Sequence, residues 1–251
     1  MARSIASARL DSSQLTSWEQ AVNRQLALSI LDRRAIGYAL ARGTCERGSD
    51  WAGGAPTRQD DHFKGHLVEV LLFCLRATLS NGTGLHLRIC EPSRPKALST
   101  TPGIDLLEVG ETGSGYYFQL WECKGTDGGV ATPLRQAAAQ LCDEDDTAYQ
   151  GFMEAYRCIQ DSPALAQDTA LSQFVHDMPG IFYDPTPQAQ KKIGAVVGTG
   201  AHCTAEDARS FPRRVATSVA GMASACHVML IRIQDFPRFR EDVFQRLWHI
   251  F

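Results

Sequence analysis

The sequence of 251 residues lacks several features that would place it in a well-defined class. It has no apolar run of about eighteen residues or more, the length that spans a bilayer, so no membrane span is expected. Residues 1–7 lack the apolar core of a signal peptide, and we therefore expect a cytoplasmic protein. No internal repeat or low-complexity tract is present, which excludes a repeat architecture.

The chain also lacks paired cysteines. Its eight cysteines are scattered, and none of them form a Cys-x-x-Cys pair. This spacing gives little support to a zinc site and favours reduced thiols in apolar segments. Thiol or zinc chemistry is a separate class of explanation, and it predicts bound zinc on elemental analysis.

There is no surplus of basic residues. With 25 Lys and Arg against 28 Asp and Glu, the formal net charge is −3. A protein that binds nucleic acid tightly by itself usually shows a basic face, which this balance does not supply. A hydrophobic content of 44% with 21% charged residues suits one compact α/β domain.

Two apolar segments rich in aromatic and branched aliphatic residues stand out near the middle of the chain. They are Gly103–Leu107 and Tyr116–Lys124, with the glycine-rich stretch Gly110–Gly115 between them. Apolar runs bounded by glycine are typical of strands, and the connector has the composition of a turn. We therefore predict an antiparallel hairpin.

The register of this hairpin would bring charged residues together. If the turn is centred between Gly113 and Ser114, Asp105 lies directly opposite Glu122 on one face of the sheet. Lys124 shares that face because strand side chains alternate with period two. Opposed carboxylates are costly to bury, and a divalent cation would offset their repulsion.

This pattern resembles the PD-(D/E)XK nuclease superfamily. The resemblance rests on Asp105 after the pair Pro102–Gly103, and on Glu122-x-Lys124 at the end of an apolar strand. It implies a restriction-endonuclease-like α/β core, with a mixed central β-sheet of roughly four to five strands flanked by helices. It also implies that Asp105, Glu122 and the main-chain carbonyl of Cys123 hold Mg²⁺, or alternatively Mn²⁺. Lys124 would orient or activate the attacking water. An ordinary hairpin with a surface Glu–Lys pair is the competing interpretation.

A helix is predicted from Asp60 to Leu79, and Glu69 lies within its apolar run Leu67–Leu75. A carboxylate in such a run is costly unless it is paired. In the superfamily, a helix before the core strands often supplies a glutamate to the metal site, so the resemblance makes Glu69 a further catalytic residue and metal ligand. Alternatively, Glu69 lies on a narrow solvent stripe near Lys64 or Arg76.

A second helix is predicted after the hairpin, with Thr132 as its N-cap and Pro133 at its first position. Its residues Gln136 and Gln140 lie on one face. Several branches of the superfamily carry a Gln-bearing helix at this point. The resemblance therefore makes Gln136, and after it Gln140, a residue that braces the site or a phosphate. Solvated glutamines on an alanine-rich helix are the alternative.

Other charged groups favour ordinary explanations. His62 and His66 are four residues apart on the first helix and could ligate a metal, but surface histidines are the favoured interpretation. The acidic run 143–146 and the basic residues Arg209, Arg213 and Arg214 are expected to be solvated.

We interpret residues 1–251 as a single nuclease-type domain with residues 1–58 as an N-terminal helical extension, because residues 15–40 follow a helical pattern. Further strands are predicted at Lys192–Gly198 and His227–Ile233. A final helix with an apolar stripe is predicted from about Pro237.

Within the superfamily, this order of elements resembles HamA, the small nuclease of the bacterial Hachiman antiphage system. That resemblance implies a magnesium-dependent endonuclease that hydrolyses DNA in antiviral defence together with a helicase partner. The alternative is a catalytically inactive subunit that keeps the nuclease fold for nucleic-acid binding or complex assembly. The near-neutral charge and the C-terminal apolar stripe favour that alternative.

Overall fold

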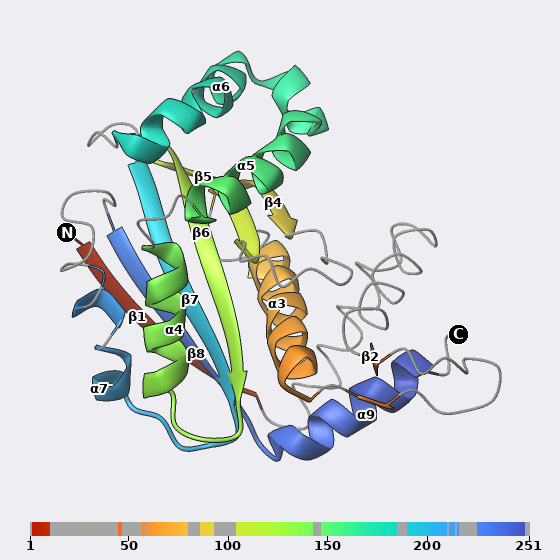
Figure 1. The fold of residues 1–251 in the computed structure, drawn as a ribbon. Helices are drawn as coiled ribbons and strands as arrows, with labels where there is room; N and C mark the ends of the chain where they lie inside the picture. The colour runs from red at the N-terminus through yellow and green to blue at the C-terminus, as the bar shows by residue number, and fades with distance from the viewer. Residues whose placement is uncertain are drawn as a thin grey trace.

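The computed structural model describes residues 2–10, 45–46, 57–58, 60–79, 86–92, 104–142, 147–184, 190–209, 211–213, 215 and 225–248. The α/β fold with a mixed sheet flanked by helices, predicted from the sequence, is confirmed (Figure 1). The helical pattern at 15–40, the acidic run 143–146 and Arg214 lie outside the described residues.

The main sheet has six strands in the order β1-β8-β7-β6-β5-β4. They are β1 (Ala2–Leu10), β4 (His86–Pro92), β5 (Leu106–Thr112), β6 (Gly115–Thr126), β7 (Gln190–Thr199) and β8 (Ala225–Ile233). Strands β4, β5 and β6 pair antiparallel, whereas β6, β7, β8 and β1 pair parallel. A separate two-stranded pair is formed by β2 (Cys45–Glu46) and β3 (Thr57–Arg58).

Strand β1 departs from the sequence prediction, which assigned residues 1–58 to a helical extension. Ala2–Leu10 instead forms the outermost strand and pairs with β8, from Ala2 opposite Ala225 to Leu10 opposite Ile233. The segment is rich in Ala, Ser and Arg, so its own composition carries a weak strand signal. A partner more than 200 residues away in the sequence supplies the hydrogen bonds that make it a strand.

The helices are α3 (Asp60–Leu79), α4 (Ala131–Leu141), α5 (Thr147–Gln160), α6 (Thr169–Tyr183), α7 (Ala205–Ala208) and α9 (Phe236–Trp248), with a 3₁₀ turn η2 (Pro163–Gln167). Helix α3 has the bounds predicted from the sequence. Helix α4 begins two residues earlier than predicted, at Ala131 rather than Pro133, with Val130 rather than Thr132 at its N-cap. The hydroxyl of Thr132 instead accepts a hydrogen bond from Arg135 at 3.0 Å. Within the described ranges, no helix is long and apolar enough to cross a membrane.

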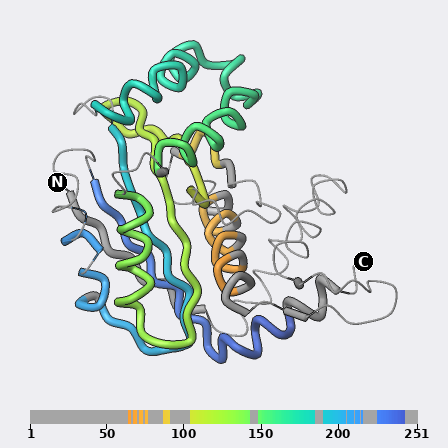
Figure 2. Tube along the Cα trace, viewed as in Figure 1, coloured from red at the N-terminus to blue at the C-terminus, as the bar shows by residue number. Residues whose placement is uncertain are grey.

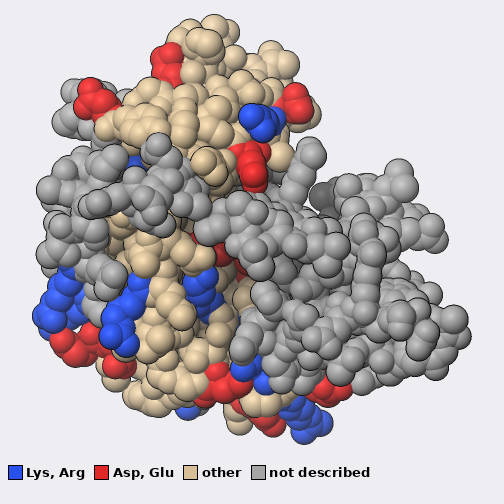
Figure 3. Space-filling model, in the orientation of Figure 1, with Lys and Arg blue, Asp and Glu red and all other residues tan. Residues whose placement is uncertain are grey.

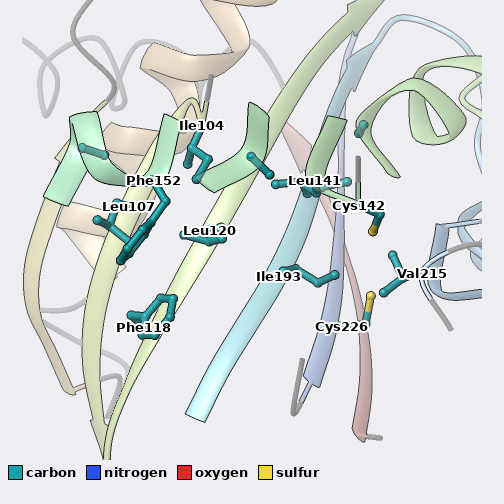
Figure 4. Close-up of a cluster of buried hydrophobic side chains, with 14 of the residues drawn as sticks. Ile104, Leu107, Phe118, Leu120, Leu141, Cys142, Phe152, Ile193, Val215 and Cys226 are labelled. Atoms are coloured by element: carbon teal, nitrogen blue, oxygen red, sulfur yellow. The ribbon is translucent and has the colours of Figure 1, made fainter. Parts of the chain in front are cut away.

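The helices cover both faces of the sheet, so the sheet has a hydrophobic core on each side. One core joins β5, β6, β7 and β8 to α4, α5 and α6, and Figure 4 shows part of it, with Phe152 of α5 next to Leu107 of β5. The other core joins Trp121 and Cys123 of β6 to Leu67, Val68, Leu71 and Leu72 of α3. Because side chains alternate along a strand, even-numbered residues of β6 face α4 and odd-numbered ones face α3.

Strand β6 is therefore the centre of the molecule. It is the longest strand of the sheet, it joins the antiparallel half to the parallel half, and both α3 and α4 run alongside it (Figures 1 and 2). The candidate site residues Glu122 and Lys124 lie in its C-terminal half. The fold thus places them where two cores and two sheet halves meet.

Candidate active site

The hairpin of β5 and β6 has the register that the sequence predicts. Leu106 pairs with Trp121 and Thr112 pairs with Gly115, which leaves Gly113 and Ser114 as the two-residue turn. The strands continue closer to the turn than predicted, because Thr112 Oγ1 donates to the Gly115 carbonyl at 3.0 Å and Gly115 takes a φ of 130°. Continuing the same register by one pair sets Asp105 opposite Glu122.

Asp105 lies one residue before β5 and is anchored to β6 by two hydrogen bonds. Its main-chain N–H donates to the Trp121 carbonyl at 3.0 Å. Its Oδ2 accepts from the Cys123 N–H at 2.6 Å. The carboxylate therefore satisfies a main-chain donor of β6 where the ladder with β5 ends. Asp105 is held directly beside the strand that carries Glu122 and Lys124.

Glu122 and Lys124 form an ion pair on one face of β6. Lys124 Nζ lies 2.6 Å from Glu122 Oε1, and the Glu122 side chain is only 3% exposed whereas that of Lys124 is 23% exposed. Two residues apart on a strand, both side chains point to the side of the sheet that α4 covers. The competing interpretation of a surface Glu–Lys pair does not fit this burial.

The ionisable groups of this site perturb one another strongly. Burial raises the pKa of Asp105 well above its usual range, and the negative charges of Glu122 and Glu69 raise it further. Burial lowers the pKa of Lys124, but attraction to Glu122 and Asp105 outweighs this, so that pKa is raised overall. Burial and the same three carboxylates raise the pKa of the Cys123 thiol well above its usual range. Clusters of perturbed groups are typical of functional sites.

Glu69 reaches this group from α3, on the opposite face of the sheet. It is half-buried, and its charge acts on Asp105 and Cys123. The two cations that the solvent-stripe alternative needed have other partners. Lys64 pairs with Asp127 at 2.6 Å, and Arg76 makes a bidentate pair with the fully buried Glu108 at 2.6 and 2.7 Å.

The glutamines of α4 are less closely tied to the site. The side chain of Gln136 is exposed, since the buried face of α4 is formed by Leu134, Ala137, Ala138 and Leu141. Gln140, four residues on, is half-buried, and its Oε1 is buried without a hydrogen-bond partner in the described part of the chain.

The site has the donor chemistry for a hard cation but not a preformed cage. Asp105, Glu122 and Glu69 supply carboxylate oxygens, and their mutual repulsion is what a cation would relieve. Among the residues that the structure describes, no group of three or more His, Cys, Asp or Glu side chains is close enough to hold a metal ion. One oxygen of Asp105 and one of Glu122 already accept hydrogen bonds. Metal binding would require these side chains to turn.

The sequence-based reasoning missed a charged cluster next to this site. Asp127, which the sequence places in a glycine-rich turn, receives Lys64 from α3 and Arg240 from α9. Arg240 is 113 residues away from Asp127 in the sequence, so no local pattern relates them. The one signal in the sequence is Arg240 itself, a charged residue beside the apolar residue Phe239 of α9, which indicates a polar contact for this helix.

On the face drawn in Figure 3, the described residues do not form a wide basic surface. Figure 3 shows acidic and basic side chains intermixed on the described part of one face. Arg209 and Arg213 are exposed, and Arg209 pairs with Glu206 of α7. The side chains of His62 and His66 lie outside the described part of the structure.

Comparison with known proteins gives no relative, because no protein-family model, no curated protein and no solved structure matches this chain.

Proposed function

We propose that this chain is a metal-dependent nuclease that hydrolyses phosphodiester bonds of DNA, with a restriction-endonuclease-like core. The observation that supports this most directly is the hairpin register, which sets Asp105 beside Glu122, with Lys124 in hydrogen-bond contact with Glu122. Two carboxylates and an ammonium group at one end of a central strand can together bind a cation and position a phosphate.

Asp105, Glu122, Glu69 and the main-chain carbonyl of Cys123 are the groups that would hold Mg²⁺ or Mn²⁺. When bound, the cation would supply charge that polarises the phosphate and acidifies a water molecule. The Cys123 N–H holds the Asp105 carboxylate, and Lys124 holds the Glu122 carboxylate. These two hydrogen bonds keep both carboxylates at the same end of β6. If Glu122 turned away to serve as a metal ligand, Lys124 would be available to the substrate.

Lys124 acts in this proposal as a charged donor rather than as a base. Its raised pKa keeps the ammonium group protonated at neutral pH, so it cannot take a proton from water there. A protonated amine beside the scissile phosphate would orient the attacking water and stabilise the charge that develops on phosphate oxygens.

A catalytically inactive subunit for nucleic-acid binding or assembly is the second candidate. It is favoured by one observation, that within the described residues no three ligand side chains are close enough to hold a metal ion. A helicase partner and a role in antiphage defence rest on the resemblance to HamA alone.

Plasmid cleavage separates the two candidates. The purified chain is incubated with supercoiled plasmid and Mg²⁺, alone and with the protein of a neighbouring gene, and compared with Glu122→Gln and Lys124→Ala. We expect nicking or linearisation by the native chain and a rate at least about a hundredfold lower for either variant, the usual effect of removing a catalytic group. Glu111→Gln, an exposed acid on the same hairpin, is the matched control and should cut normally.

Thermal unfolding gives a readout that does not depend on turnover. Mg²⁺ should raise the melting temperature of the native chain, because it binds the folded state and relieves carboxylate repulsion. The same addition should leave Glu122→Gln nearly unchanged. A native chain that neither cuts DNA in any combination nor responds to Mg²⁺ would contradict the nuclease proposal and favour the inactive subunit.

A further inference from the structure

Three charged side chains from distant parts of the sequence meet where β6 ends. Asp127 follows β6, Lys64 lies in the first turns of α3, and Arg240 lies on α9. Lys64 Nζ is 2.6 Å from Asp127 Oδ2. Arg240 Nη1 donates to both carboxylate oxygens of Asp127, at 2.8 and 3.0 Å. We call these residues the Asp127 cluster.

The Asp127 cluster contains more positive than negative charge. One carboxylate is shared by two cations, so the three side chains together carry a surplus of one positive charge. Arg240 is 4% exposed, and its Nε is buried with no hydrogen-bond partner among the residues that the structure describes. A buried, incompletely satisfied guanidinium is costly and is therefore usually retained for a further ligand or for a structural reason.

Solvent reaches the cluster at the position of the carboxylate. The Asp127 side chain is 41% exposed, whereas those of Lys64 and Arg240 are 14% and 5% exposed. The carboxylate is thus the most exposed group of the cluster, and both cations contact it from more buried positions. An anion that takes the place of this carboxylate would reach both cations at once.

The cluster adjoins the proposed catalytic residues. An ideal Cβ placed on Gly125 would lie 2.5 Å from the Lys64 carbonyl oxygen, so the backbone of α3 rests directly on β6 one residue after Lys124. Asp127 is three residues beyond Lys124, and three residues span at most about 11 Å. The cluster therefore lies at most about three steps of a nucleic-acid helix from Lys124, at roughly 3.4 Å per nucleotide, so a neighbouring phosphate is within its reach.

We propose that Lys64 and Arg240 bind a backbone phosphate of the nucleic acid next to the one at the catalytic residues, and that Asp127 occupies their place until nucleic acid binds. This inference rests on the proposed function. A phosphate diester carries one negative charge and oxygens that accept from arginine and lysine, as the Asp127 carboxylate does. Burial raises the pKa of Asp127, but hydrogen bonds from Lys64 and Arg240 outweigh this and lower it overall, so at neutral pH the carboxylate is ionised and competes with phosphate.

The test is equilibrium binding of a fluorescein-labelled 20-base-pair duplex by the full chain in EDTA, where cleavage does not interfere, across a series of salt concentrations. Asp127→Asn should bind about tenfold more tightly than the native chain, because it removes the competing charge and keeps both cations. Lys64→Gln should bind about tenfold more weakly, with the slope of log affinity against log salt reduced by about one. Arg238→Gln, which removes an exposed cation of the same helix α9, is the matched control and should change affinity far less.

Arg240→Gln is also tested. Because this substitution removes a buried side chain, its binding result counts only if circular dichroism shows that the variant is folded. The inference is overturned if Asp127→Asn leaves binding unchanged or weakens it, if Lys64→Gln behaves like Arg238→Gln, or if the native chain binds no duplex. If the native chain cleaves DNA but these variants bind the duplex with native affinity, the phosphate site is contradicted and the nuclease proposal is not. The expected binding changes without any cleavage would contradict the nuclease activity alone.

Discussion

At the scale of the residue, Lys191 illustrates how burial sets charge in this protein. It lies on β7, is 5% exposed, donates to the Phe182 carbonyl at 3.0 Å and rests 3.7 Å from the centre of the Phe182 ring. Burial lowers its pKa from the ordinary value of 10.5 to about 8. The unfolded chain therefore binds a proton between pH 8 and 10.5 that the folded chain has released.

This difference predicts a pH dependence of stability. The free energy of unfolding of the native chain, relative to Lys191→Met, should rise by about 3 kcal/mol as pH increases from about 8 to about 10.5, because the cost of burying the charge disappears. Below pH 8 both states are protonated and the difference should be flat. Urea unfolding followed by circular dichroism at several pH values measures it. Arg135→Met, which removes an exposed side chain, is the control, and a flat difference for Lys191→Met would contradict the prediction.

Arg76 and Glu108 show the same balance with a partner present. Burial raises the pKa of Glu108, and the attraction of Arg76 lowers it by less, so the pKa stays raised. For Glu108, the ion pair therefore does not fully offset the cost of removing the carboxylate from water. Such a pair adds little net stability, but removing one partner leaves a buried charge and costs about 3–5 kcal/mol. The pair holds the C-terminal end of α3 against β5. It thereby helps to set where Glu69, on the same helix, lies relative to the sheet.

At the scale of the element, the packing of α3 on β6 controls the site. Gly125 allows the backbone at Lys64 to lie against β6, because any Cβ there would meet the carbonyl group of Lys64 at 2.5–2.6 Å. Backbone atoms cannot turn aside as a flexible side chain can. Because Gly125 has no Cβ, α3, which carries Lys64 and Glu69, can pack this close to β6 and to Lys124.

Gly125→Ala should consequently push α3 away from β6. We expect a loss of about 1–3 kcal/mol in the free energy of unfolding, the usual cost of forcing a methyl group into a packed contact. We also expect plasmid cleavage slowed by up to about a hundredfold, as misplacement of a site by about 1 Å can cause. Urea unfolding and the plasmid assay measure the two effects. Gly129→Ala, four residues later in the turn that follows β6 and with nothing within 4 Å of the added methyl group, should show neither effect. Equal behaviour of the two variants would contradict this account.

At the scale of the whole molecule, β1 closes one side of the sheet. It pairs with β8 over nine residues, from Ala2 to Leu10, and so covers a strand whose side chains are mostly buried. Without β1, the main-chain donors and acceptors on that side of β8 would be unpaired. An exposed apolar edge strand is a template for pairing with another chain.

Removal of residues 1–10 should therefore lower the melting temperature and promote association. Size-exclusion chromatography with light scattering and thermal unfolding measure these effects. Replacing residues 2–10 by a glycine-serine segment of equal length should have a similar effect, because such a segment is a poor strand former. A truncated chain that stays monomeric with an unchanged melting temperature would show that β1 is dispensable.

The sequence by itself determined the elements whose information is local. The dense apolar run of residues 60–79 predicted α3 with its observed bounds, and the glycine-rich connector predicted a hairpin with the observed register. These predictions hold because helix periodicity and strand alternation are set by neighbours a few residues apart. The placement of Asp105 beside Glu122 follows from that register. The pairing of Glu122 with Lys124 follows from side-chain alternation along β6.

Only the tertiary structure decided what depends on distant partners. Strand β1 exists through β8, Asp127 is held by Arg240, and the Asp105 carboxylate is bonded to the Cys123 N–H. The exposure of Gln136 depends on how α4 is turned against the sheet, since its buried face is formed by Pro133, Leu134, Ala137, Ala138 and Leu141. These features arise from contacts between segments far apart in the chain, and local residue patterns carry no record of which segments will meet.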